Sequence, residues 1–184
     1  MKKILSTAVA TALLSTAAFA EEQKMPDFSK VKFDTNAIYA SAAVAIQSVT
    51  DMDSGVALIV TGGVPFMEIN DKSNLAAEVE ISQSIVDPSS DITIFNTTIS
   101  TSVSITTFAA YAAYSYDINP QMFAKVKAGL LYESLGGDAD SSDTGISYGI
   151  QGGYNLNSKM AVTVGLDIIE ADVMNTYVGV QYKY

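Results

Sequence analysis

Long stretches of this chain alternate apolar and polar residues with a period of two. In residues 122–133, Val126 and Leu130 fall on one face, whereas Lys125 and Lys127 fall on the other. This period belongs to a β-strand, because successive side chains of a strand point to opposite faces of the sheet. The sequence therefore predicts strands that each separate an apolar face from a polar or charged face.

Eight such runs follow residue 37. They lie at about 37–48, 54–66, 75–86, 102–116, 122–133, 145–155, 159–169 and 174–184. A tilted strand that crosses a bilayer needs about 9–11 residues, so each run is long enough to cross. Pro65 should lie near the end of its strand, because proline cannot donate a hydrogen bond to the ladder. The first and fourth runs are rich in Ala, Ser and Thr, and their facing stays open.

Two connections between runs repeat each other. Residues 116–122 and 154–160 both begin with Tyr, carry Asn at the fourth position and end with Met. Asn, Asp, Pro and Ser favour turn backbones, so both segments are predicted to be tight turns between neighbouring strands. That arrangement is the hairpin unit of an up-and-down antiparallel sheet.

The separation of apolar and charged faces indicates a membrane barrel. A soluble sheet hides its apolar face, whereas a membrane barrel turns that face toward lipid and keeps polar side chains inside. Inward charges such as Glu78 and Lys125 disfavour a soluble lipocalin-like barrel, which needs an apolar interior. We predict an all-β fold, a closed antiparallel up-and-down transmembrane β-barrel of eight strands over residues 37–184.

Two pairs of opposite charge should meet inside this barrel. Glu78 and Glu80 share one face of the third run, and Lys125 and Lys127 share one face of the fifth. A charge held away from water needs a partner, so we predict a lumen ion cluster of these four residues. Within it, Glu80 and Lys125 are one expected pair. Two carboxylates could also serve a glycosidase, but the matching lysine pair favours the structural interpretation.

The start of the chain has the pattern of an export signal. Residues 1–20 combine two early lysines with a short apolar stretch and the cleavage pattern Ala18-Phe19-Ala20. The apolar stretch is shorter than the roughly 20 residues of a membrane-spanning helix. We therefore predict a cleaved signal peptide at 1–20, followed by a flexible periplasmic lead-in at 21–36, which is polar and lacks a clear period.

The end of the chain carries a second pattern. Val180, Tyr182 and Tyr184 lie at alternate positions of the last run, on its apolar face, and the chain stops at Tyr184. A terminal aromatic strand of this kind resembles the signal that is read by the outer-membrane barrel assembly machinery. We expect these three residues to form the assembly signal.

The signal peptide, the eight runs, the Tyr-x-x-Asn turns and the aromatic terminus together resemble the small outer-membrane barrels, the opacity-protein and OmpA-like surface antigens. The resemblance covers roughly residues 37–184. It implies a location in the outer membrane of a Gram-negative cell, and a role like that of the adhesins and structural barrels of this group. The connections of this chain look unusually short for the group, and it has no arginine.

Composition excludes several kinds of chemistry. The chain has no histidine and no cysteine, which removes the usual nucleophilic triads and zinc sites. Loss of Lys2 and Lys3 with the signal peptide would take the formal net charge from −10 to −12, a poor match for nucleic acid. Acidic residues gather between alternate runs, on the side that the family's topology turns outward. Asp138, Asp140 and Asp143 lack the remaining ligands of a calcium loop, so we expect solvated charge and no metal or cofactor.

The sequence thus favours a non-enzymatic outer-membrane barrel with a structural or surface-interaction role. The alternative is a narrow channel for small solutes, because inward Gly, Ala and Ser residues could leave a thin water path. An enzyme is disfavoured by the missing histidine. The expected partners are outer-membrane lipid, lipopolysaccharide and the assembly machinery, with the protein itself a monomer.

Overall fold

A computed structural model describes residues 33–34, 37–94, 97–137, 141–170 and 173–184. The predicted signal peptide at 1–20 lies outside the described residues, as does most of the predicted lead-in at 21–36. All regular structure in the described part is β-strand. None of it forms a helix that is long and apolar enough to cross a membrane.

Nine strands follow one another along the chain. They are β1 (Tyr39–Val49), β2 (Gly55–Asn70), β3 (Ser73–Val86), β4 (Ser89–Ile94), β5 (Thr97–Asn119), β6 (Met122–Gly137), β7 (Ser141–Asn155), β8 (Met160–Glu170) and β9 (Val173–Lys183). Every pairing between them is antiparallel.

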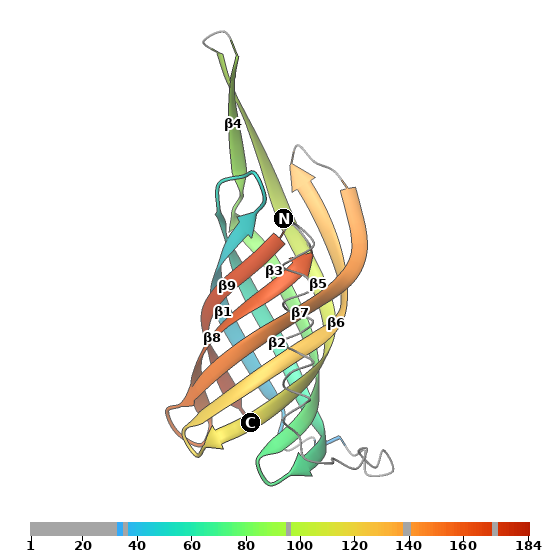
Figure 1. Cartoon of the computed structure of the whole chain (residues 1–184), viewed down its shortest axis with the longest axis vertical. Coiled ribbons are helices and arrows are strands. Elements are labelled where there is room, and N and C mark those ends of the chain that lie inside the picture. The colour runs from blue at the N-terminus through green and yellow to red at the C-terminus, as the bar shows by residue number, and fades with distance from the viewer. Residues whose placement is uncertain (1–32, 35–36, 95–96, 138–140, 171–172) are drawn as a thin grey trace, which may run out of the picture. The chain divides into compact units, whose positions relative to one another are not determined.

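Eight of these strands close into a ring. The hydrogen-bonded order is β3-β2-β1-β9-β8-β7-β6-β5, and β5 pairs with β3 to complete the circle (Figure 1). The first and last strands of the chain meet along eleven residue pairs, from Tyr39 with Lys183 to Val49 with Val173. The predicted closed, up-and-down, eight-stranded barrel is therefore confirmed for the ring.

The ninth strand, β4, lies outside the ring and was not predicted. It pairs with the first part of β5, from Ser89 with Ser102 to Ile94 with Thr97. The resulting hairpin arm, residues 89–102, projects beyond the ring in Figure 1. The expectation of short connections is wrong at this position. The arm was missed because it does not cross lipid, so its Ser- and Thr-rich sequence carries no membrane-facing apolar row.

Three tight turns close the opposite end of the ring, here called the turn end. Each uses an asparagine side chain as an acceptor for backbone N–H groups within the turn. Asn119 Oδ1 accepts from the N–H groups of Gln121 and Met122, and Asn157 Oδ1 accepts from those of Lys159 and Met160. Asn70 makes a similar bond to Lys72. The repeated Tyr-x-x-Asn segments are thus equivalent hairpin turns. The end that carries the arm is the loop end.

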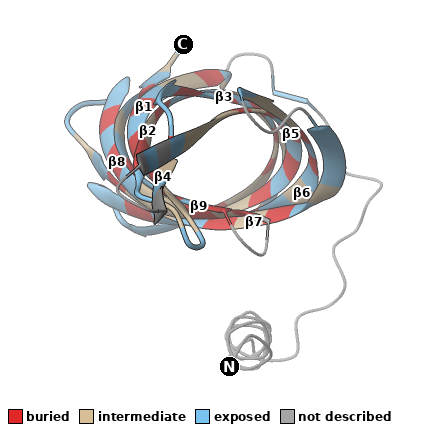
Figure 2. Ribbon diagram, turned by 90° about the horizontal axis from the view of Figure 1, so that it is seen from above, coloured by how far each residue is buried: buried red, intermediate tan, exposed pale blue. Residues whose placement is uncertain are grey.

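Side chains alternate between the outside and the inside of the ring, as Figure 2 shows by the striping of buried and exposed residues along each strand. On β6, Leu130 is 72% exposed, whereas Lys127 is 6% exposed. The sequence did not decide which residues of the first and fourth runs face inward, and burial decides it. Ala43 and Ala45 of β1 and Tyr111 of β5 are buried and point inward.

Pro65 lies inside β2, and its place differs from the expected strand end. The ladder between β2 and β3 shifts register between Pro65 and Met67, so the proline coincides with a bulge where no ladder donor is needed. The carbonyl of Pro65 accepts a hydrogen bond from the backbone N–H of Asp34 at 2.8 Å. This bond ties the described end of the lead-in to the barrel.

Candidate functional site

The structure brings the four charged residues named from the sequence together inside the ring. Lys125 Nζ lies 2.5 Å from Glu78 Oε1, and Lys127 Nζ lies 2.6 Å from Glu80 Oε2. All four side chains are buried. The expected pairing of Glu80 with Lys125 is wrong, because strand tilt displaces the facing positions and matches Glu80 with Lys127.

A third carboxylate joins this cluster. Asp167 Oδ2 of β8 lies 3.0 Å from Lys127 Nζ, so that lysine is held between two acids. The carboxylate reaches Lys127 by lying across Gly149 of β7. A Cβ at Gly149 would stand 1.9 Å from Asp167 Oδ1, so only glycine leaves room for this contact. The sequence did not connect Asp167 to the cluster, since the contact reaches across the intervening strand β7.

Hydroxyl groups complete the coordination of the two glutamates. Tyr39 donates to Glu78 Oε1 at 2.6 Å, and Thr61 donates to Glu80 Oε2 at 3.0 Å. Tyr111 donates to Glu80 Oε1 at the longer distance of 3.5 Å and shares a 2.9 Å bond with Ser147. Charge-assisted bonds of this kind make a buried ion pair tolerable, because they replace the water that each charge loses.

Aromatic rings flank both lysines. Lys125 Nζ lies 4.6 Å from the centre of the Tyr39 ring, and Lys127 Nζ lies 4.5 Å from the centre of the Tyr111 ring. Tyr177 approaches Lys127 from the other side, at 5.9 Å. An ammonium group over an aromatic face is attracted by the negative charge of the ring face. The tyrosines therefore hold the cations in the lumen as well as filling it.

Glycines in the wall make space for these rings. A Cβ at Gly63 would lie 2.2 Å from the Tyr39 ring, and a Cβ at Gly165 would lie 2.4 Å from the Tyr177 ring. The rings can lie against the strands only because these positions have no side chain. Sequence alone could not say which aromatic residue covers each of these glycines.

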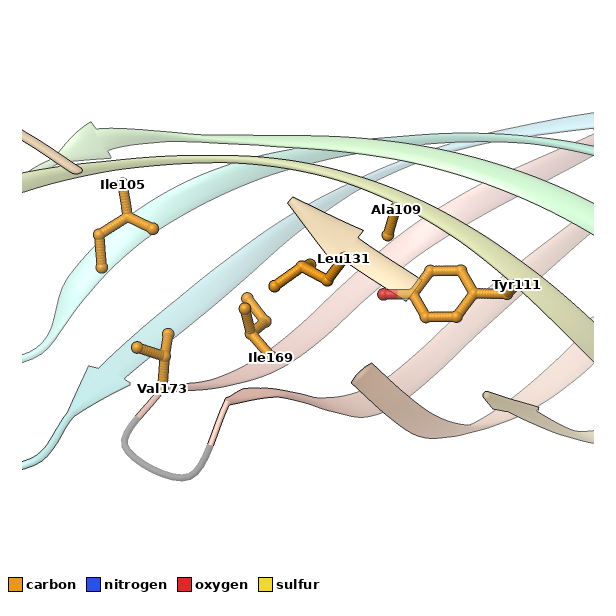
Figure 3. Close-up of a cluster of buried hydrophobic side chains, with 6 residues drawn as sticks. All are labelled: Ile105, Ala109, Tyr111, Leu131, Ile169 and Val173. Carbon is orange, nitrogen blue, oxygen red and sulfur yellow. The ribbon is translucent and has the colours of Figure 1, made fainter. Parts of the chain in front are cut away.

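An apolar layer closes the lumen between the ion cluster and the loop end. It consists of Ile105, Ala109, Tyr111, Leu131, Ile169 and Val173, all buried (Figure 3). The sequence predicted a polar interior, so this apolar layer was not expected. Tyr111 belongs to both the apolar layer and the ion cluster, since its ring packs in the layer and its hydroxyl reaches Glu80. The lumen is thus filled by two consecutive layers.

The three residues of the expected assembly signal lie on the outside of the ring. Val180 and Tyr182 are exposed on β9, and Tyr184 follows the end of that strand with its N–H donating to the carbonyl of Ile38. The rings of Tyr182 and Tyr184 contact edge to face, with centroids 5.1 Å apart. Their role in assembly stays a prediction.

The part of the chain that the structure describes holds no group of three or more acidic side chains that could bind a metal ion. Of the acidic loop named above, Asp138 and Asp140 lie outside the described residues, and Asp143 is exposed on β7. Glu78 and Glu80, the pair considered for a glycosidase, each face a lysine and a hydroxyl donor. In this arrangement Glu78 neutralises Lys125, and Glu80 neutralises Lys127.

Comparison with known proteins places these features in a family. Residues 6–184 match the model of the outer membrane protein β-barrel domain. No curated protein matches the sequence. Three solved structures share the fold at low sequence identity.

The outer membrane protein OprG from Pseudomonas aeruginosa is 12% identical, covers 84% of this chain and 98% of its own, and has a TM-score of 0.57. Neisserial surface protein A is 18% identical, with 80% and 96% covered and a TM-score of 0.50. Ail, the attachment invasion locus protein of Yersinia pestis, was solved in complex with the heparin analogue sucrose octasulfate. It is 11% identical, with 80% and 97% covered and a TM-score of 0.50.

A double-mutant cycle tests the ion pairs. We expect Glu78→Gln or Lys125→Met alone to lower the free energy of unfolding by about 3–5 kcal/mol, because each leaves one buried charge without its partner. The double variant should cost much less than the sum. The measurement is urea unfolding in lipid vesicles. The control cycle combines Glu78→Gln with Lys127→Met, whose effects should come closer to adding. Additive effects in the first cycle would contradict the pairing.

Proposed function

Because the chain belongs to the outer membrane protein β-barrel family, we propose that it is a closed, non-enzymatic barrel of the outer membrane that presents its hairpin arm at the cell surface. It would act as a monomer in contact with outer-membrane lipid and lipopolysaccharide. This function combines a structural role for the ring with a surface-interaction role for the arm.

The observation that carries this proposal is the closure of the lumen at two levels. The ion cluster fills one level and the apolar layer fills the next, toward the loop end. An eight-stranded barrel is only wide enough for its own side chains, so little room is left for a solute. The closed lumen supports a structural barrel over the narrow channel that was the alternative.

The residue content of the lumen also supports a role without catalysis. The chain contains no histidine to act as a general base and no cysteine to act as a nucleophile. Three of the four described buried acids are engaged by lysines: Glu78 by Lys125, and Glu80 and Asp167 by Lys127. The fourth described buried acid is Glu133 of β6. A general acid or base must be able to exchange its proton with a substrate, and the three paired acids are occupied by lysines.

Export and orientation follow from the two ends of the chain. We propose that residues 1–20 direct export and are removed, and that Val180, Tyr182 and Tyr184 direct insertion by the assembly machinery. The loop end would face outward and the turn end would face the periplasm. In this orientation the hairpin arm stands outside the cell.

The arm is suited to binding because it extends beyond the ring. Along residues 97–102, β5 forms its ladder with β4, whereas its ladder with β6 begins at Val103 and its ladder with β3 begins at Thr106. On the other side, β4 touches the ring through the single bridge from Asp53 to Ser89 among the described residues. An unpaired strand edge offers backbone donors and acceptors to an extended partner segment.

Electrical recording tests the closed lumen. We expect no sustained current through the wild-type barrel in planar bilayers, because both layers block the path. Leu131→Ala with Ile169→Ala should stay closed, since the ion cluster remains, and Glu80→Ala with Lys127→Ala should stay closed, since the apolar layer remains. Only the four changes together should give defined current steps. Large stable currents through the wild type would favour the narrow channel instead.

Shortening the arm tests the surface role. Ser89 and Ser102 face each other in the ladder, so residues 90–101 can be replaced by an Asn-Gly turn. We expect normal outer-membrane levels, because no ring pairing is lost, together with reduced aggregation of cells and reduced attachment to matrix-coated surfaces. Cells that express the wild-type chain and cells without it are the controls. Unchanged attachment by the shortened protein would contradict a binding role for the arm.

A further inference from the structure

The outer wall of the ring contains an apolar hollow of about 880 Å³. Its centre is a row of register partners on five neighbouring strands: Ala124, Gly152, Val164, Val178 and Val44. A second outward row, two residues further along each strand, lines the other side of the hollow. The hollow therefore crosses β6, β7, β8, β9 and β1 and ends at Val56 of β2.

Burial shows that the hollow opens outward and not into the lumen. Ile150 and Val164, which line it, are 58% and 57% exposed. Among the inward residues of the lining, Ala45 is 1% exposed and Lys125 is 4% exposed, so their side chains are covered inside the ring. The hollow is consequently part of the surface that the barrel family turns toward lipid.

Small residues cause the depression. Gly152 is an outward position at which an added Cβ would meet no atom within 4 Å, and its neighbour on β6 is only an alanine, Ala124. On the inner side of the same wall, Gly165 lets the Tyr177 ring lie close to the strands. The wall is therefore thin at this point, and its surface lies below that of the surrounding valines and isoleucines.

We propose that this hollow is a binding site for one acyl chain of a phospholipid whose headgroup lies at the turn end. Among the outward-facing residues of the lining, Thr176 is the only polar one, which fits a hydrocarbon occupant. Five strands at about 4.8 Å spacing give a trough of roughly 19 Å, comparable with the roughly 15 Å depth of one leaflet. The trough is continuous with the rest of the lipid-facing wall.

Charge selects the phospholipid over lipid A as the source of the acyl chain. Gly152 and Val164 lie a few residues above the turn between β7 and β8, and that turn carries Lys159. Lys159 is exposed, with its Nζ 5.7 Å from the centre of the Tyr182 ring, where an ammonium can meet a lipid phosphate. Exposed acids occur at both ends of the ring, such as Asp71 at the turn end and Asp51 at the loop end, but the described lysines of the rims, Lys72, Lys159 and Lys183, all lie at the turn end, where they can attract a lipid phosphate.

A second copy of the chain fits the hollow less well than lipid. A twofold dimer would place the same surface of both copies in contact, so a concave wall would face a concave wall. That contact would leave a void in the centre of the interface, and a void loses the packing contacts on which association depends. A flexible acyl chain fills the same space without this loss.

Filling the hollow tests the proposal, which rests on the placement of the wall in lipid. Gly152→Leu projects a side chain into the hollow. Gly62→Leu is the matched control, because Gly62 also faces outward with a Cβ 3.8 Å from its nearest neighbour but lies outside the hollow. Lys159→Gln removes the expected headgroup contact. The full mature chain is refolded in detergent with phosphatidylglycerol, and native mass spectrometry measures the lipid that stays bound.

We expect the wild type and Gly62→Leu to retain one phosphatidylglycerol, and Gly152→Leu to retain about tenfold less, since displacing about two methylene groups has an effect of that size. Lys159→Gln should lower retention by a smaller factor. Equal retention by all four proteins would overturn the site. A dimer mass that only Gly152→Leu abolishes would assign the hollow to a second copy, and preferential retention of lipid A would overturn the phospholipid.

Heat-dependent gel migration first establishes that each variant is folded. If Gly152→Leu does not fold, Ala124→Leu fills the same row from β6 and takes its place. The outcome is also separate from that of the proposed function, because a conducting barrel could still bind lipid at its outer wall. Current through the lumen and lipid retention at the hollow therefore report on different parts of the molecule.

Discussion

A backbone that crosses lipid must satisfy its hydrogen bonds within itself, and the rest of this structure depends on that constraint. An open sheet would leave two unpaired edges in hydrocarbon, so the sheet has to close. Here β3 pairs with β5 and β1 pairs with β9 to complete the ring. Among the described strands, β4 and the first part of β5 are exempt. They form the arm beyond the ring, where water can reach the backbone and the membrane constraint does not apply.

Closure with eight strands fixes a narrow interior, and the narrow interior determines the chemistry of the site. Charges on β3 and β6, which are separated in the ring only by β5, come within ion-pair distance inside it, so Lys125 and Lys127 reach acids that lie 47 residues away in the chain. Large tyrosines fit only where a facing glycine makes room, as at Gly63 beneath Tyr39. At Gly165 the missing side chain likewise lets the Tyr177 ring lie close to the strands, so the wall is thin where the outer hollow lies.

Much of the fold could be predicted because lipid imposes a regular pattern on sequence. Each ring strand must show an apolar row outward, so alternation revealed the runs, and the Asn-containing turns revealed how they connect. The inward position of Glu78, Glu80, Lys125 and Lys127 followed from the same rule.

What the sequence could not supply were features that depend on relations between strands. The pairing of Glu80 with Lys127 depends on strand tilt, and the inclusion of Asp167 depends on the gap at Gly149. The apolar layer around Ile105 combines three inward residues of β5 with one each from β6, β8 and β9, which come together only when the ring closes. The arm was not predicted, because a strand outside the membrane does not need the outward apolar row by which the ring strands were recognised.

The central claim is that one face of each ring strand meets lipid while the other lines a closed, charged lumen. The chain has no cysteine, so single cysteines can carry a nitroxide label at each position from 124 to 131 of β6 in lipid vesicles. Collision with oxygen, which concentrates in lipid, should be high at Ala124, Val126 and the even positions that follow. It should be low at Lys125, Lys127 and the odd positions. A profile without a period of two, or one with the opposite phase, would contradict the account.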